Sequence, residues 1–359
     1  MIAAGSVIVG GGPAGCAAAI RLVRAGERPL LIERRPEGAD ALCGGFLSWR
    51  TLDRLGALGI SREELGGHPV IALRLIAGEK VRSTKLPAPA MGLSRRRLDG
   101  LMMERARNLG ASIIHAAASF ADGQLRLDSG EPVDAGCLFL ATGKHDLRGL
   151  PRSREAAGAD PMMGLRIRVE PSAALRRMLA GHIEMHLFPG GYAGVVLQED
   201  GTANICMAVR KSRLTAAGGK PAALLAELVA QYPHLAERLA DMPPHAAFDA
   251  VGHVPYGWRE KTGTQGIFRL GDQAGVIPSL AGEGIGIALA SADEAVRFWQ
   301  AGGAASAFAY QRLLAARLRR PLAVAGMAAK WGEGRGAGFM AALAGVPGVA
   351  TVVAGMTRV

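Results

Sequence analysis

A glycine-rich turn directly follows the first apolar segment and limits what the N-terminal region can fold into. Residues 6–9 read Ser-Val-Ile-Val, and Gly10, Gly12 and Gly15 then follow in the pattern G-x-G-x-x-G. The first glycine permits a tight turn, the second lets the backbone approach a bound group, and the third lets a helix pack closely on the strand. Free N–H groups and the positive dipole end of that helix favour phosphates, and Pro13 fits its first turn. We therefore predict a strand, turn and helix that bind a pyrophosphate.

An acidic residue ends the second apolar segment of the chain. Residues 29–32 read Pro-Leu-Leu-Ile, and Glu33 follows them. Glu33 comes about 20 residues after the glycine turn, where a carboxylate accepts hydrogen bonds from the hydroxyls of an adenosine ribose. Because a carboxylate repels a 2′-phosphate, this site suits FAD or NAD and not NADP.

Composition narrows the classes of protein and of partner that fit the chain. Of its 359 residues 49% are hydrophobic and 50 are glycine, which is typical of a globular α/β protein with many tight turns. Lys and Arg exceed Asp and Glu by 42 to 31, a net charge of +11. Aromatic residues make up 5%, and no zinc-finger or helix-turn-helix pattern is present, so we expect no nucleic acid partner. The charge instead favours a small-molecule substrate that is anionic or carrier-bound, or contact with an anionic membrane surface.

The cysteines and the N-terminus indicate a cytoplasmic location. Cys16, Cys43, Cys137 and Cys206 are widely spread and form no CxxC pair, as is usual for reduced cysteines. The first apolar run has no basic segment before it and leads straight into the glycine turn, so it does not match a signal peptide.

The pattern of apolar segments predicts an α/β fold in which one domain is inserted into another. We expect a Rossmann-like nucleotide-binding domain formed by residues 1–70, 91–160 and 255–330. Residues 71–90 and 161–254 are expected to form an inserted substrate domain, and residues 331–359 a C-terminal helical segment. The inserted domain is predicted to be an antiparallel β-sheet with helices on one side. Its predicted strands are residues 163–169, 183–188, 192–198 and 203–209.

A second glycine-rich element follows the strand predicted at residues 267–270. It begins with Gly271-Asp272, contains Pro278, and ends in residues 281–286, Ala-Gly-Glu-Gly-Ile-Gly, before a long helix. Asp272 is suited to accept hydrogen bonds from ribityl or ribose hydroxyls. The N-terminal N–H groups of the helix that begins near Gly284 suit the pyrimidine edge of a flavin, which carries negative charge when reduced.

A third motif lies at the start of a helix predicted over residues 95–109, which Ser94 caps and Gly110 ends. Arg95 is followed there by Leu98-Asp99. Together the three motifs resemble those of the FAD-dependent monooxygenase and geranylgeranyl reductase superfamily, the p-hydroxybenzoate hydroxylase-like flavoproteins. The resemblance implies a bound FAD that the Arg95 side chain reaches. It also implies NAD(P)H as a transient reductant, since the chain contains no second dinucleotide fingerprint.

The chain departs from the superfamily's motifs at two positions. The DG motif appears as Ala141-Thr142-Gly143, without its aspartate, and Ser279 stands where many relatives have proline. The flavin pocket is therefore expected to differ in detail from those of the relatives. The predicted cofactor-binding residues are Gly10, Gly12, Pro13, Ala14, Gly15, Glu33, Arg34, Gly44, Gly45, Arg95, Thr142, Gly143, Asp272, Gly282, Gly284 and Ile285.

Residues for the substrate are predicted with alternatives left open, and no catalytic residue or metal ligand is assigned. His186, Phe188 and Tyr192 could share a pocket facing the flavin, or they could be core residues of the sheet. Cys43 and Phe46 flank Gly44-Gly45 in a loop that resembles one beside the flavin of geranylgeranyl reductases; Cys43 could equally be a small buried residue.

Two charge patterns also allow more than one interpretation. Arg166 and Arg168 alternate with apolar residues, which indicates either a solvated sheet face or an anchor for an anionic substrate. Residues 336–357 contain no charged residue, but Pro347-Gly348 interrupts them, so we expect helices that pack on the nucleotide-binding domain. Peripheral membrane contact is the alternative.

These features predict an FAD-dependent oxidoreductase. We expect an NAD(P)H-dependent monooxygenase that hydroxylates a small aromatic or polyketide-like substrate through a flavin hydroperoxide. The alternatives are a geranylgeranyl-reductase-like enzyme that reduces a carbon–carbon double bond of an isoprenoid, and a non-catalytic flavin-binding partner. Flavin halogenases carry a WxWxIP segment, which residues 255–259, Pro-Tyr-Gly-Trp-Arg, do not match. Substrate identity, the choice of NADH or NADPH, and oligomeric state do not follow from the sequence.

Overall fold

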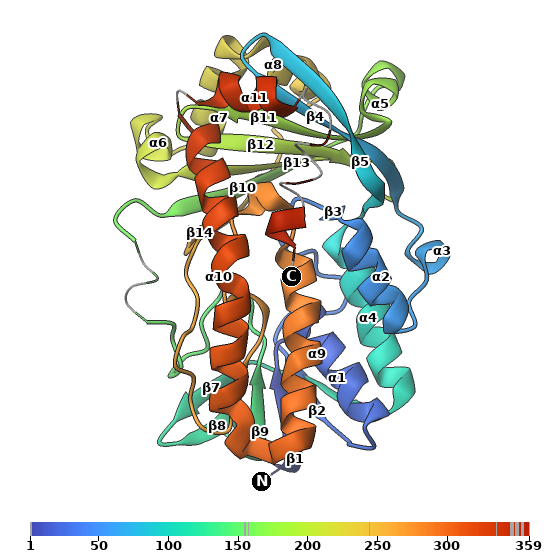
Figure 1. The fold of residues 1–359 in the computed structure, drawn as a ribbon, viewed down its shortest axis with the longest axis vertical. Helices are drawn as coiled ribbons and strands as arrows, with labels where there is room; N and C mark the ends of the chain where they lie inside the picture. Colours follow the sequence, from blue (N-terminus) through green and yellow to red (C-terminus); the bar gives the residue numbers. More distant parts are fainter. Residues whose placement is uncertain are drawn as a thin grey trace.

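The computed structural model describes residues 2–153, 156, 158–243, 245–334, 336–344, 348, 352 and 355–358. It contains two β-sheets, one in each half of the molecule as drawn in Figure 1. The first sheet has 7 strands and carries the glycine turn. Its strands in spatial order are β6 (Ser112–His115), β2 (Leu30–Glu33), β1 (Ile2–Val9), β9 (Pro132–Leu140), β8 (Gln124–Leu127) and β7 (Ala118–Ala121), with β15 (Ile267–Arg269) also paired to β9.

The parallel strands of this sheet bring the sequence motifs to one edge. β6, β2, β1, β9 and β15 are parallel, whereas β7 and β8 form an antiparallel extension. In a sheet of parallel strands the carboxyl ends lie at the same edge, where ligands of α/β proteins bind. The ends of β1, β2, β9 and β15 therefore place Gly10, Glu33, Thr142 and Asp272 at this edge.

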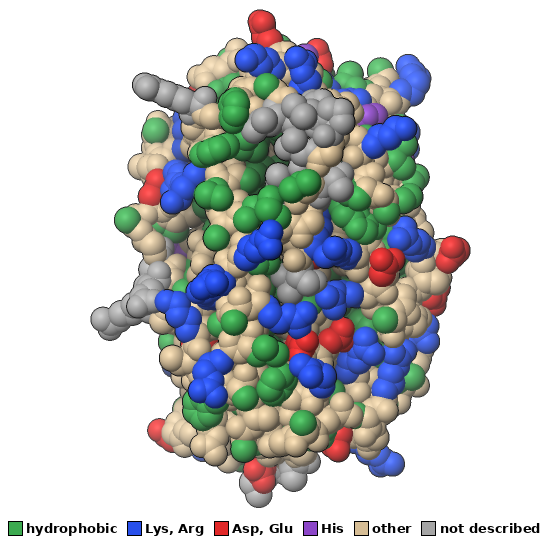
Figure 2. All heavy atoms as spheres, in the orientation of Figure 1, with side chains coloured by type: hydrophobic (Ala, Val, Ile, Leu, Met, Phe, Trp, Pro, Cys, Tyr) green, Lys and Arg blue, Asp and Glu red, His purple; other side chains and the backbone are tan. Residues whose placement is uncertain are grey.

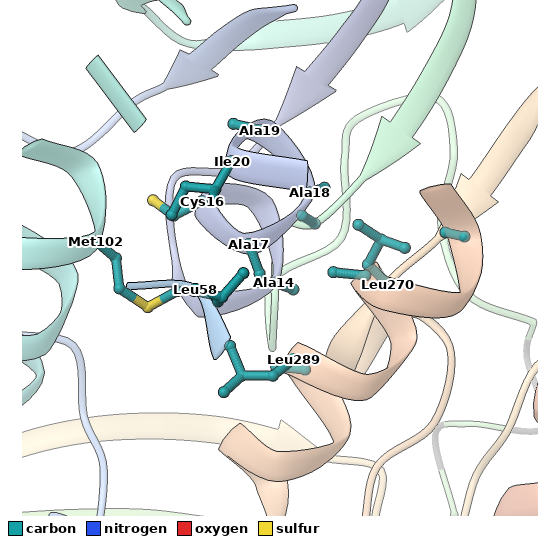
Figure 3. Close-up of a cluster of buried hydrophobic side chains, with 14 of the residues drawn as sticks. Ala14, Cys16, Ala17, Ala18, Ala19, Ile20, Leu58, Met102, Leu270 and Leu289 are labelled. Atoms are coloured by element: carbon teal, nitrogen blue, oxygen red, sulfur yellow. The ribbon is translucent and has the colours of Figure 1, made fainter. Parts of the chain in front are cut away.

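Helix α1 (Pro13–Arg24) is the centre of the first domain's core because its buried face is built from small residues. Ala17, Ala18 and Ala19 are fully buried, and Figure 3 shows Ala17 on the side of α1 that faces Leu58 and Leu289. Small side chains let helix axes come close together. The helices that pack on α1 are α4 (Arg95–Leu109) and α9 (Gly284–Gly302).

The second sheet has 8 strands and corresponds mainly to the insertion expected from the sequence. Its strands in spatial order are β14 (Asp249–Val254), β10 (Met162–Val169), β13 (Ala203–Arg210), β12 (Gly191–Leu197), β11 (Gly181–Phe188), β4 (His68–Ala77), β5 (Lys80–Gly92) and β3 (Phe46–Leu47). Most neighbours are antiparallel, but β11 and β4 are parallel. The strands predicted between residues 163 and 209 pair antiparallel with one another, as expected, and the parallel pair joins β11 to β4 from a separate segment of the chain.

One face of the second sheet is covered by helices, and the other faces the first domain. Leu224, Leu228 and Leu235 pack with alternate residues of β10, β12 and β13 in one buried cluster. The helices of this half are α5 (Ala173–Leu179), α6 (Lys211–Ala216), α7 (Pro221–Gln231) and α8 (Pro233–Leu239). Because side chains of a strand alternate between faces, residues one position away from this cluster face the first domain.

The long helix α10 links the two halves. α10 (Ala307–Gly332) runs beside both sheets in Figure 1, and α11 (Ala337–Ala344) follows it against β4 and β5. Two further helices are α2 (Trp49–Ala57) and α3 (Arg62–Leu65), and two 3-10 turns, Gly271–Gln273 and Ser279–Ala281, lie between β15 and α9. Among the described residues, no helix is both long and apolar enough to cross a membrane.

Candidate functional site

A cavity of about 920 Å³ connects the motif-bearing edge of the first sheet with the open face of the second sheet. Its polar end is lined by the glycine turn, Glu33 and Asp272. Its other end is lined by strands of the second sheet and by the last turns of α10. The cavity thus has room for an elongated cofactor and for a second molecule beside it.

The glycines of the first turn have the spatial roles that their spacing indicates. Gly10 has φ +108°, and a Cβ there would lie 2.3 Å from the Ala141 carbonyl oxygen. A Cβ on Gly15 would lie 1.8 Å from the Gly10 carbonyl oxygen, so this glycine is needed for the close packing of α1 on the turn. Gly12 is different, because the nearest atom to its Cβ position is Arg95 Nη2 at 3.1 Å and the residue lines the cavity. The fold itself therefore does not require a glycine at position 12, and the missing side chain leaves space for a ligand in the cavity.

Glu33 is the last residue of β2, and its carboxylate is ionised. It accepts hydrogen bonds from the backbone N–H groups of Gly11, at 2.5 Å, and Arg35, at 2.8 Å. Burial alone would raise the pKa of Glu33, but these N–H groups and the Arg35 guanidinium hold it below its usual range. A fixed carboxylate at this place suits the hydroxyls of a ribose.

Arg95 is held rigidly beside the glycine turn. Its guanidinium donates to both carboxylate oxygens of Asp99, at 2.7 and 2.8 Å, one helical turn along α4. Ser94 caps that helix as predicted, accepting from the Arg97 N–H at 3.1 Å, and Gly110 ends it at φ +111°. The fixed guanidinium faces the cavity at Gly12, where a phosphate would find a positive partner.

The geometry of this end fits FAD. The cavity side of Gly12 is open, a guanidinium and a helix N-terminus supply positive charge, and a carboxylate stands at the ribose position. All but one of the predicted cofactor-binding residues line the cavity, and Gly15 supports the turn beneath it. The lining residues are Gly10, Gly12, Pro13, Ala14, Glu33, Arg34, Gly44, Gly45, Arg95, Thr142, Gly143, Asp272, Gly282, Gly284 and Ile285.

A buried arginine fixes the loop that carries Cys43, Gly44 and Gly45. Arg166 pairs with the carboxylates of Asp40 at 2.8 Å and Asp249 at 2.6 Å. It also donates to the Ala41 carbonyl oxygen at 3.1 Å. Of the two interpretations left open for Arg166, the solvated face does not fit, because its side chain is 4% exposed. Arg166 lies on β10 and Asp40 lies in the loop, so this ion pair fixes the loop to the second sheet.

The predicted substrate residues separate into two groups. Cys43, Phe46 and Tyr192 line the cavity. Phe188 packs in the cluster under the helices, on the face of β11 away from the cavity. His186 lies two residues before Phe188 and so shares that face, where its Nε2 is 3.1 Å from Glu184 Oε2. Of the two interpretations left open for these residues, the core one fits His186 and Phe188, because Ile183 and Met185 are the β11 residues that line the cavity.

Three hydroxyl groups form the polar cluster of the otherwise apolar end. Tyr256 Oη donates to Ser279 Oγ at 2.8 Å, and Tyr192 Oη is hydrogen-bonded to the same oxygen. Burial raises the pKa of both tyrosines, so both keep their protons. Tyr256 was not assigned from the sequence; it lies two residues after the end of β14. Connected hydroxyls of this kind can orient an oxygen of a ligand or pass on a proton.

A buried ion pair at the start of α9 was also missed from the sequence. Glu283, the residue before α9, is 1% exposed, and Arg358 Nε lies 3.1 Å from its Oε2. Arg358 also donates to the Ala281 carbonyl oxygen at 2.7 Å and lies over the ring of Trp49. The two residues are far apart in the chain, and no local pattern links them.

Glu283 gives a testable pH dependence. Burial raises its pKa to about 7, although Arg358, Ser48, Arg54 and Arg50 act in the opposite direction. Between about pH 4.5 and pH 7 the folded protein therefore keeps a proton that the unfolded chain has lost, and stability falls as the pH rises through this window. The decline over this window is about 3 kcal/mol, and we expect Glu283→Gln to remove it. Urea unfolding of both proteins at several pH values measures it, and a difference that is constant with pH would contradict the assignment.

Comparison with known proteins agrees with this geometry. Residues 4–145 match the family model of the FAD binding domain. Digeranylgeranylglycerophospholipid reductase 2 of Methanopyrus kandleri is 27% identical over 308 residues, which is 78% of this chain and 72% of the relative.

Two solved structures illustrate the range of proteins with this fold. PqsL of P. aeruginosa, in complex with 2-aminobenzoylacetate, has a TM-score of 0.73 at 16% identity and covers 94% of this chain and 99% of its own. A geranylgeranyl bacteriochlorophyll reductase-like protein of Thermoplasma acidophilum has a TM-score of 0.74 at 19% identity, covering 99% of this chain and 92% of its own. At these identities the structures establish the fold alone. The chain is thus similar to FAD binding domains over residues 4–145, and its fold resembles those of PqsL and of the reductase-like protein.

Proposed function

We propose that this protein reduces a carbon–carbon double bond in an isoprenoid or a similar long apolar molecule. The observation that carries the proposal is the apolar end of the cavity, which extends well beyond the polar end that fits FAD. Its lining residues include Leu73 and Leu75 of β4, Ile183 and Met185 of β11, Val324 and Ala328 of α10, and Met340 of α11. The 27% identity to a reductase that is named for an isoprenoid lipid supports the same class.

Reduction of a double bond adds a hydride to one carbon and a proton to the other. FAD, when bound and reduced, supplies the hydride. The proton must come from the chain or from water, and the hydroxyls of Tyr192, Ser279 and Tyr256 are the connected donors that line the apolar end. In the proposed step one tyrosine O–H bond breaks as the carbon–hydrogen bond forms, and the cluster recovers its proton from solvent. The apolar walls keep other water away from the reacting carbons.

The reductant is proposed to be NAD(P)H. The chain has one dinucleotide fingerprint, at Gly10, Gly12 and Gly15, and this fingerprint is assigned to FAD. A pyridine nucleotide would then bind only while it reduces the flavin.

A monooxygenase that hydroxylates a small aromatic or polyketide-like substrate is the second candidate. The hydroxyl cluster favours it, because Tyr192, Ser279 and Tyr256 could hold the oxygen of a phenol within the cavity. The similarity of fold to PqsL, which extends over 99% of the PqsL chain, is also compatible with this candidate.

Turnover under isotopically labelled dioxygen separates the two candidates. The purified FAD-loaded protein is incubated with NADH or NADPH and an isoprenoid substrate, with and without dioxygen. We expect a product heavier by two hydrogens that carries no label and forms equally well without oxygen. A labelled product that requires oxygen would reject the reductase and support the hydroxylase.

The same assay tests the hydroxyl cluster. Tyr192→Phe and Tyr256→Phe should lower kcat by about 10- to 100-fold while FAD content stays unchanged, since each removes one donor of the proton path. The control is Tyr232→Phe, on the helix-covered face. Equal rates for all three variants would remove the cluster from the reaction.

A further inference from the structure

Three large apolar side chains are exposed together where α10 ends and α11 begins. Met327, Trp331 and Phe339 are 59%, 51% and 57% exposed, and the rings of Trp331 and Phe339 meet edge to face at 6.0 Å. Figure 2 shows hydrophobic side chains gathered over this upper part of the face that α10 and α11 occupy in Figure 1. We call these three residues the mouth patch. Large apolar side chains exposed side by side on a protein mark an interaction site.

The mouth patch lies where the cavity reaches the surface. Met327 and Trp331 are exposed and also line the cavity, together with Met340 of α11. An apolar molecule that enters the cavity at this point would pass over the patch. The patch is therefore continuous with the proposed substrate site and is more than a group of scattered surface residues.

Exposed cations surround the mouth patch. Arg320 precedes Met327 by seven residues and Trp331 by eleven, so the three share one stripe of α10, and Lys330 is adjacent. On the other side Lys80 approaches α11, its Nζ 3.5 Å from the Cβ position of Gly338. The nearby carboxylates are Glu79, which is exposed, and Glu333, which is 9% exposed and bonded to Arg210. Positive charge therefore prevails at the rim.

We propose that the mouth patch docks on an anionic lipid surface, from which a long apolar substrate enters the cavity directly. Apolar and aromatic side chains at the boundary of the acyl region, with Lys and Arg at the level of the headgroups, are the pattern of an interfacial protein surface. A second copy of this chain fits less well. A symmetric pair would bring Arg320, Lys330 and Lys80 of both copies together and repel itself.

Sedimentation with lipid vesicles tests the docking surface without using turnover. The FAD-loaded protein is mixed with vesicles of phosphatidylcholine, with or without phosphatidylglycerol. We expect binding to the phosphatidylglycerol vesicles that weakens with added salt, and little binding to phosphatidylcholine alone. Trp331→Ser with Phe339→Ser, and separately Lys80→Glu with Lys330→Glu, should each weaken binding at least about tenfold.

Matched controls lie at the other end of α10. Phe308 is 42% exposed and Arg312 is exposed, far from the mouth patch along the helix. Phe308→Ser and Arg312→Glu should keep binding within about twofold of the original protein. FAD content and circular dichroism confirm that each variant is folded.

Three outcomes would overturn the proposal. These are no binding to anionic vesicles, equal weakening by the control variants, and a dimer in light scattering that Trp331→Ser dissociates, which would make a second copy the occupant. Because vesicle binding is read without a substrate, its failure is separate from a failure of the proposed reaction.

Discussion

Replacing Gly12 by valine is expected to give a folded protein that no longer binds FAD. The Gly12 Cβ position lies 3.1 Å from Arg95 Nη2, and no other atom group crowds it. A branched side chain there would fill the space left for the pyrophosphate and push away the guanidinium that is fixed on Asp99. We expect the Kd for FAD to rise at least about 100-fold. Titration of the apoprotein with FAD, followed by flavin fluorescence, measures the change.

Two comparison variants make this result specific to the ligand. Gly15→Ala should fail to fold, because its Cβ would lie 1.8 Å from the Gly10 carbonyl oxygen. Gly56→Ala, in α2 where no atom lies within 4 Å of the added Cβ, should leave FAD binding unchanged. If Gly12→Val bound FAD as tightly as the original protein, the pyrophosphate would not lie at this turn.

The cofactor end of the cavity could be predicted from the sequence because its signals are local. A glycine turn, an acidic strand end and a capped helix are each encoded by fewer than about 20 consecutive residues. The structure then brings these segments together at the ends of parallel strands, as the fold requires. The helix over residues 95–109 has the predicted bounds for the same reason, since Ser94 and Gly110 mark both ends.

The substrate end could not be predicted in the same way. Both faces of β11 carry apolar residues, so alternation could not tell that Met185 faces the cavity while His186 and Phe188 face the helices. That choice depends on which layer packs on each face, and the layers come from distant parts of the chain.

Ion pairs between residues that are far apart in the sequence could not be predicted either. The partners Arg166 and Asp40, and Glu283 and Arg358, come from separate elements, and in the sequence each looks like an ordinary surface charge. Only the tertiary structure reveals that these charges are buried and paired, and thus that they fix the loop and the turn beside the cofactor end.

Replacing Arg238 by alanine is expected to destabilise the protein strongly, although Arg238 touches no part of the cavity. Glu184 is fully buried on β11, and it accepts from Arg238 Nε at 2.7 Å and Nη2 at 3.0 Å. Arg74 and His186 are its other partners. Removing one partner of a buried ion pair leaves a charge without compensation, which costs about 3 to 5 kcal/mol. Because Arg74 remains, we expect a loss of about 3 kcal/mol in the free energy of unfolding.

The pH dependence of this loss identifies its cause. Burial alone would raise the pKa of Glu184, but His186 and Arg238 hold it well below its usual range. A depressed carboxyl pKa stabilises the fold above the unfolded value of about 4.3, and that contribution is lost as the pH falls below it. Without Arg238 the folded pKa rises. The difference between the two proteins should therefore be largest near neutral pH and shrink toward about pH 3.

Urea unfolding of Arg238→Ala at several pH values, beside two further variants, completes this test. Arg213→Ala breaks a pair with Glu227 whose side chains are 22% and 41% exposed, and should cost less than about 1 kcal/mol. The double variant Arg238→Met with Glu184→Gln removes both the buried carboxylate and its partner, and should recover most of the stability. A loss in Arg238→Ala that does not change with pH, and that the double variant does not recover, would mean that the Arg238 side chain acts through packing and not through charge.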